Sequence, residues 1–169
     1  MQRLITFGLA LYSFFLIKTN IHRLPERIPT HFNVTGEADG WGSPGTLWVL
    51  LLVQGLTCGL FLVVPLLAGR FPGMVNVGFR TLSDFTPGQR ERIIPFLTDM
   101  MGYMSILLSL FFCILLRDII HAASSSHPHI SLWWELGLFL AGTAATVIYY
   151  LRRIFAVANE TRKENPGTA

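Results

Sequence analysis

The stretch LWVLLLVQGLTCGLFLVVPLLA, from Leu47 to Ala68, decides the fold class of this chain. It contains no Asp, Glu, Lys or Arg, and its most polar side chain is Gln54. An apolar run needs about 20 residues to cross the hydrocarbon core of a bilayer as a helix. The stretch is long enough, and it is therefore predicted to be a transmembrane helix.

Three other apolar runs flank this stretch, and they predict helices at about residues 3–19, 95–116 and 132–151, in addition to 47–68. The last run has Trp133 at its start and Tyr149 near its end, and such aromatics mark membrane interfaces. The first run is short, but Lys18 can extend its side chain to the interface. A signal peptide is the alternative for this run, yet no small-residue cleavage site follows it. We therefore expect a retained helix.

The composition agrees with a bilayer as the main partner of the chain. Of its 169 residues 51% are hydrophobic and 14% are charged, whereas about 25% are charged in an average soluble domain. The net charge of +3 comes from scattered basic residues, so no basic block predicts a nucleic acid partner. The two cysteines, Cys58 and Cys113, lie inside apolar runs, where a disulfide framework is not expected. The sequence thus predicts an all-α integral membrane protein with four transmembrane helices.

The positions of the basic residues predict the orientation, because Lys and Arg are enriched in cytoplasmic segments. With a cytoplasmic N-terminus, nine basic residues lie inside: Arg3, Arg70, Arg80, Arg90, Arg92, Arg152, Arg153, Arg162 and Lys163. Four lie outside: Lys18, Arg23, Arg27 and Arg117. Both termini are therefore predicted to be cytoplasmic, with a membrane domain over 1–151 and a cytoplasmic tail over 152–169. All five histidines, His22, His31, His121, His127 and His129, then share the extracytoplasmic face.

The extracytoplasmic loop over residues 20–46 has the composition of a defined structure. Its prolines, Pro25 and Pro29, exclude a helix and favour extended geometry for the residues before them. Its glycines Gly36, Gly40 and Gly42 permit positive φ, while Asn33 and Asp39 bond to nearby backbone groups in turns. A tight succession of turns is expected. Its apolar side chains, which would hold it on the helices or at the interface, are Ile28, Phe32 and Trp41.

The loop also carries a spaced signature, LPxxIPxHFNxxGxxDxWG, from Leu24 to Gly42. This signature resembles that of bacterial membrane proteins of unknown function related to SdpI, an immunity and signalling protein against a secreted killing peptide. The segment from Asn76 to Thr81 resembles a second element of the same family. The resemblance implies a location in the bacterial cytoplasmic (inner) membrane and a peptide or protein partner bound by the loop over 24–44. The implied binding residues are Pro25, Ile28, Pro29, His31, Phe32, Asn33, Gly36, Asp39 and Trp41.

Several polar residues leave two interpretations open. His31, with Glu37, Asp39, His127 and His129, offers the ligand types of a zinc site, but the spacing is not a recognised pattern, so hydrogen bonding is favoured. For His31 we expect bonds to backbone carbonyls that lock the loop. An ionisable residue in a membrane segment is a candidate for function. The two such residues are expected to pair with arginines instead: Asp99 with Arg92, and Glu135 with Arg117 or Arg27.

The sequence shows no nucleophile beside a base, no paired catalytic carboxylates and no glycine-rich phosphate loop, so neither an enzyme nor a cofactor is predicted. Three hypotheses follow: a non-enzymatic protein that binds an extracytoplasmic peptide or protein, an accessory subunit of a larger membrane complex, and an extracytoplasmic metal-dependent enzyme. Small residues at helical spacing allow close helix packing, within the bundle or in a homo-oligomer. They are Gly55 and Gly59, and Gly137, Ala141 and Ala145.

Overall fold

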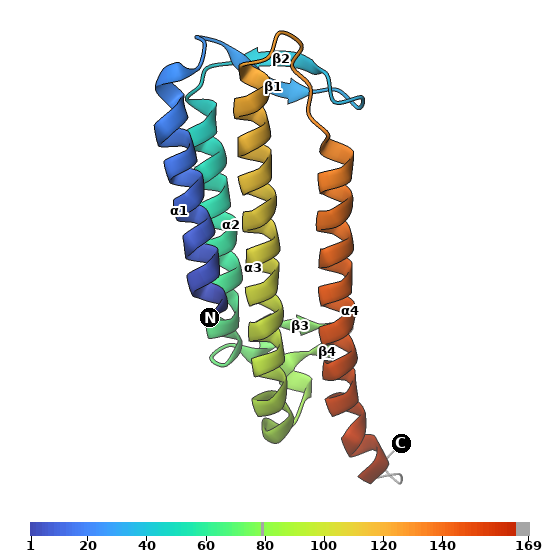
Figure 1. Ribbon diagram of the computed structural model, residues 1–169. Helices are drawn as coiled ribbons and strands as arrows, with labels where there is room; N and C mark the ends of the chain where they lie inside the picture. The colour runs from blue at the N-terminus through green and yellow to red at the C-terminus, as the bar shows by residue number, and fades with distance from the viewer. Residues whose placement is uncertain (79, 165–169) are drawn as a thin grey trace.

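The computed structural model describes residues 1–78 and 80–164, and it forms a bundle of long helices with a small β-hairpin at each end (Figure 1). Four helices in the described part are long and apolar enough to cross a membrane, which is consistent with a multi-pass membrane protein. They are α1 (Gln2–Asn20), α2 (Thr46–Ala68), α3 (Pro87–Ala123) and α4 (Leu132–Glu164). Short 3₁₀ turns cover Ile21–Arg23, Pro72–Met74 and Leu82–Asp84.

Helix α3 is the centre of the bundle, because α1, α2 and α4 all pack on it. Its small polar side chains form contacts with α1 and α2 in the interior. The Ser105 hydroxyl lies 2.8 Å from that of Thr6, and the Ser109 hydroxyl lies 3.0 Å from the Cys58 sulfur. Such contacts satisfy polar groups where no water is present, and small side chains let helices approach closely. Helix α4 packs mainly on α3 and stands at the side of the bundle.

Helix α3 begins eight residues before the predicted start at residue 95 and continues past 116 to Ala123. Its first turn is stabilised by a capping box, in which the Thr86 side chain accepts from the Gln89 N–H and the Gln89 side chain accepts from the Thr86 N–H. Pro87 occupies a position at the first turn where its missing N–H costs nothing. The apolar run therefore marks only a part of the helix.

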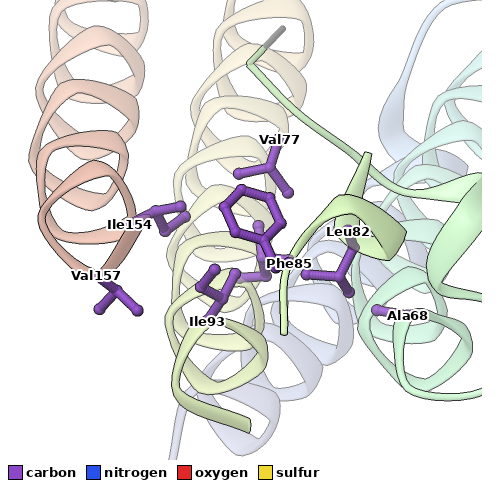
Figure 2. Close-up of a cluster of buried hydrophobic side chains, with 8 residues drawn as sticks. Ala68, Val77, Leu82, Phe85, Ile93, Ile154 and Val157 are labelled. Atoms are coloured by element: carbon purple, nitrogen blue, oxygen red, sulfur yellow. The ribbon is translucent and has the colours of Figure 1, made fainter. Parts of the chain in front are cut away.

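Helix α4 likewise continues through Glu164, into the segment that was predicted to be a tail over 152–169; residues 165–169 lie outside the described residues. The reason is a cluster of buried side chains at this end of the bundle, drawn in Figure 2. Ile154 and Val157 of α4 face Ile93 of α3 and the segment between α2 and α3 there. The members of this cluster are Ala68, Val77, Leu82, Phe85, Ile93, Leu97, Ile154 and Val157.

Each end of the bundle carries one antiparallel hairpin. Strands β1 (Ile28–Phe32) and β2 (Ala38–Gly42) pair at the end where α2 and α4 begin. Strands β3 (Asn76–Val77) and β4 (Arg80–Thr81) pair at the end that holds both termini of the described chain. The predicted succession of turns in the first loop is therefore a β-hairpin, because Pro25 and Pro29 favour extended geometry and the glycines lie where strands and turn need them.

Candidate functional site

The segment over 24–44, here called the hairpin cap, lies across the helix ends and is fixed there by its apolar inner face (Figure 1). Ile28 has no exposed surface and packs with Leu47 of α2 and Leu116 of α3. Pro29 is also fully buried, and Phe32 packs against the same cluster while partly exposed. Burial of one such aliphatic side chain contributes about 1.5–3 kcal/mol. The cap is therefore anchored on the bundle by its inner face.

A cavity of about 360 Å³ lies between the hairpin cap and the helix ends. Most of its lining is apolar, so it is suited to an apolar side chain, and His31 is the only ionisable residue of the lining. The lining consists of Ile28, Pro29, Thr30, His31, Phe32, Thr46, Leu47, Leu50, Leu115, Ile119, Ile130 and Leu132. Three of the predicted binding residues, Ile28, Pro29 and Phe32, are therefore brought together beside His31.

The tip of the hairpin is closed by Asn33 and Gly36. The Asn33 Oδ1 accepts hydrogen bonds from the backbone N–H groups of Thr35 and Glu37, each at 3.0 Å. Gly36 has φ of +90°, and a Cβ at this position would overlap the carbonyl oxygen of Ile130. A side chain at position 36 is thus excluded both by conformation and by space. The predicted positive φ occurs at Gly36, but neither Gly40 nor Gly42 has it.

The loop between α3 and α4 holds this tip through hydrogen bonds between residues that lie 90 or more positions apart in the sequence. The Ile130 N–H donates to the Gly36 carbonyl at 2.9 Å, and the Ala38 N–H donates to the Pro128 carbonyl at 3.1 Å. A ring nitrogen of His129 lies 3.0 Å from the Thr35 carbonyl, and the Trp133 indole N–H donates to the Val34 carbonyl. Pro128, His129, Ile130 and Trp133 were not among the predicted binding residues, although His129 had been considered as a zinc ligand. No local sequence signal marked this strand-like segment, because its partner lies far away in the sequence.

His31 and Asp39 form an exposed cross-strand pair, and the exposed residues of the cap are here called its outer side. His31 also borders the cavity under the cap. The Nδ1 of His31 bonds to Oδ1 of Asp39, so the prediction that His31 bonds backbone carbonyls is wrong. Both side chains are accessible, with 73% and 46% of their surface exposed. A carboxylate only accepts, so Nδ1 carries the proton and the opposite ring nitrogen, Nε2, is an acceptor in the neutral ring. The pair therefore offers an oriented acceptor to a ligand.

Gly40 and Trp41 complete this outer side. A Cβ on Gly40 would lie 2.7 Å from the Cβ of His31, so the strand needs glycine where it passes the histidine. Trp41 is 45% exposed and thus does not serve as an apolar anchor in the way that Ile28 and Phe32 do. Pro25 is also exposed. The predicted binding residues therefore divide into a buried anchor and an exposed outer set that includes His31, Asp39 and Trp41.

The remaining histidines lie at the same end of the bundle, in the turn after α1, at the end of α3 and in the loop before α4. Among the side chains that the structure describes, those of residues 1–78 and 80–159, no group of three or more His, Cys, Asp or Glu is placed to hold a metal ion. His129 is used in the clamp on Thr35. Side-chain hydrogen bonds are thus seen for two of the five histidines, His31 with Asp39 and His129 with the Thr35 carbonyl.

The two ionisable residues singled out in the apolar runs have different surroundings. Asp99 is exposed, and its backbone carbonyl accepts from the Gln2 side chain. Glu135 lies near Arg117, as expected, but it also lies within reach of the Asp118 carboxyl. Arg117 makes its ion pair with Asp118 at 2.9 Å.

The opposite end of the bundle is basic. Arg70, Arg80, Arg90, Arg152 and Arg153 lie there, together with Arg3 near the start of α1. Arg80 stacks on the Phe85 ring at 4.7 Å, and Asp84 caps the turn by accepting from the Thr81 backbone N–H at 2.8 Å. This hydrogen bond is the main cause that lowers the pKa of Asp84 below its ordinary value. The side chains of Arg162 and Lys163 lie outside the described residues.

Comparison with known proteins gives one match. A family model described as a domain of unknown function (DUF1648) matches residues 6–55. This range begins in α1, includes the whole hairpin cap and ends in the first half of α2. The family model therefore covers the cap together with parts of the two helices that flank it in the sequence. Neither the curated proteins nor the solved structures contain a match to this chain.

Proposed function

We propose that this chain is a non-enzymatic membrane protein that binds an extracytoplasmic peptide or protein through the hairpin cap. The observation that carries the proposal is the division of the cap into an anchored inner face and an exposed outer face. Ile28 and Pro29 are fully buried, whereas His31, Asp39 and Trp41 remain accessible on a backbone that the 128–130 segment holds in place. A preorganised surface loses less entropy on binding than a mobile loop would.

The surface offers four kinds of contact to a peptide. Trp41 is a partly exposed aromatic, and aromatics are enriched among the residues that dominate binding energies. The cavity beside His31 fits an apolar side chain, and the His31–Asp39 pair can accept a hydrogen bond from a backbone N–H. A two-stranded sheet also has unpaired backbone groups at its edges, and an extended peptide can add to such an edge.

The proposed side of the membrane rests on charge. The end with both termini collects most of the arginines, and the hairpin cap is at the other end. The orientation is tested by labelling intact bacterial cells with a membrane-impermeant maleimide. Val34→Cys at the cap should react in intact cells, whereas Gly88→Cys at the basic end should react only after the membrane is opened. The native Cys58 and Cys113 are buried and give little background. The reverse pattern would place the cap in the cytoplasm and remove the proposal.

Binding is tested by purification from native membranes in mild detergent, with mass spectrometry of the proteins that are retained. A partner of the cap should be retained by the wild type and lost from His31→Ala, while Arg23→Ala, also exposed at this end, serves as the control. Thermal unfolding of each variant shows that it is folded. Equal retention by His31→Ala and by the wild type would refute a site at the cap.

A role as accessory subunit is the second candidate, and α4 carries the observation that favours it. This helix packs mainly on α3, so its opposite side is uncovered. Gly137, Ala141 and Ala145 are exposed, and a Cβ on Gly137 would meet no other atom within 4 Å. These residues are therefore not used for packing inside the bundle. A partner retained by the His31→Ala variant but lost from Ala141→Leu would favour this role.

A further inference from the structure

A groove between α3 and α4, separate from the hairpin cap, has an apolar interior and a charged opening. Its volume is about 290 Å³. Leu110, Phe111 and Ile114 line it from α3, and Leu138 and Phe139 line it from α4. Arg117 and Glu135 line its end on the side of the hairpin cap.

The length of the groove along α3 equals the thickness of one leaflet of the hydrocarbon core. Its lining on α3 runs from Leu107 to Arg117, and ten residues of helix cover about 15 Å. Half of a bilayer core of roughly 30 Å is the same length. At the inner end the helices come into contact, because a Cβ on Gly142 would lie only 3.2 Å from Leu107. A transmembrane peptide helix would need about twice this length, so the groove matches an acyl chain of a single leaflet.

In the described part of the chain, two carboxyls and one guanidinium meet at the opening of the groove. Arg117 pairs with Asp118, whose side chain is only 17% exposed, and Glu135 brings a second carboxyl into the neighbourhood of the same residues. The Oε2 atom of Glu135 is buried and has no hydrogen-bond donor. A buried carboxylate oxygen without a donor is costly. A positively charged N–H donor placed here would satisfy this oxygen atom.

We propose that this groove binds an aminophospholipid of the leaflet on the hairpin side, such as phosphatidylethanolamine. The ammonium group donates to Glu135 and Asp118, the phosphate contacts Arg117, and one acyl chain fills the apolar groove. The Arg117 side chain is 61% exposed, so it can reach a phosphate while it pairs with Asp118. Phosphatidylcholine has the same net charge, but its quaternary ammonium has no N–H to donate. The inference does not depend on the function proposed for the hairpin cap.

The test compares these two lipids on the purified full chain. The protein is incubated in detergent with an equal mixture of phosphatidylethanolamine and phosphatidylcholine of identical chains, and native mass spectrometry counts the lipids retained. The wild type should retain about ten times more phosphatidylethanolamine, since tenfold corresponds to about 1.4 kcal/mol, which one charge-assisted hydrogen bond can supply. Glu135→Gln should lower this ratio to about one. Glu26→Gln, an exposed carboxyl at the same end of the bundle, should leave the ratio unchanged.

A second variant tests the groove itself. Leu138→Trp fills the groove from α4, and Leu138 is 56% exposed, so the change does not disturb a packed core. Retention of both lipids should fall to the level of a protein without the site. Equal retention of the two lipids by the wild type would overturn the proposal and would mean that the two carboxyls are satisfied without an ammonium, for example by a shared proton. Unchanged preference in Glu135→Gln, or unchanged retention in Leu138→Trp, would overturn it as well.

Discussion

Replacement of Gly36 by alanine should release the hairpin cap from the loop between α3 and α4. Gly36 has φ of +90°, a region that costs a residue with a side chain about 1–2 kcal/mol. The new Cβ would also overlap the Ile130 carbonyl, and this would break the bonds of Gly36 to Asn33 and to Ile130, both 2.9 Å long. Each such bond contributes about 1 kcal/mol. The clamp should therefore weaken by about 3–4 kcal/mol.

Hydrogen–deuterium exchange of the protein in lipid nanodiscs measures this loss directly. A cost of about 3 kcal/mol corresponds to local opening roughly a hundred times more frequent, so backbone amides over 33–40 and at 130 should exchange about a hundredfold faster. Gly45→Ala is the matched control, because Gly45 has a helical φ of −56° and its Cβ would only reach ordinary contact with Ser43. If Gly36→Ala exchanged no faster than Gly45→Ala, the clamp would not hold the cap.

Three further predictions concern other parts of the structure. Asn33→Ala should lower the local stability of the hairpin tip by about 1–2 kcal/mol, because the Thr35 and Glu37 N–H groups lose their acceptor. Asn33→Asp keeps an acceptor and serves as the control. Equal amide exchange in the two variants would contradict the prediction. Phe85→Ala should lower the free energy of unfolding by about 3–5 kcal/mol, because Phe85 is only 3% exposed in the cluster of Figure 2. A loss below about 1 kcal/mol in chemical denaturation would show that the cluster does not hold the helix ends together. The pKa of Asp84 is lowered in the folded chain, so Asp84 stabilises the turn fully above its ordinary pKa near 3.8, and this stabilisation is lost as the pH falls through the lower folded value. Amide exchange over 76–84, corrected for its intrinsic pH dependence, should show this loss in the wild type but not in Asp84→Asn.

The membrane helices could be predicted because their signal is local. A run such as Leu47–Ala68 is apolar over its whole length, and in lipid a helix is the structure that satisfies its backbone. The ends of α3 and α4 could not be predicted in the same way. In α3, Arg90 lies on a helical turn that precedes the apolar run. In α4, Ile154 lies beyond the apolar run and is buried against the segment between α2 and α3. Hydropathy finds the lipid-facing part of a helix and not its whole length.

The hairpin cap was predictable in its location but not in its pairing. Pro29, Asn33 and Gly36 each have the local preference that the structure uses. The partner of His31 depends on strand register, and the register depends on Gly40 lying against the histidine. The clamp by the 128–130 segment is a contact between distant parts of the chain, and no local pattern specifies such a pairing.

The groove between α3 and α4 could not be predicted from the sequence either, because it too depends on contacts between distant parts of the chain. Arg117 and Glu135 were expected to be close, but the second carboxyl of Asp118 and the apolar lining depend on how two helices lie against each other. Apolar side chains that line a groove and apolar side chains that face lipid look alike in the sequence. Only the arrangement of the helices in space shows which of them line the groove.

The most direct test of the central claim, that the outer face of the hairpin cap contacts a peptide or protein, is site-specific photo-crosslinking in living cells. A photoreactive phenylalanine analogue replaces Trp41 on the cap, or Val49 as a control, which is 56% exposed near the start of α2. The account predicts a discrete peptide or protein adduct from position 41, weaker when His31→Ala is added, and none from position 49. Lipid adducts alone at position 41, or the same protein adducts from both positions, would contradict it.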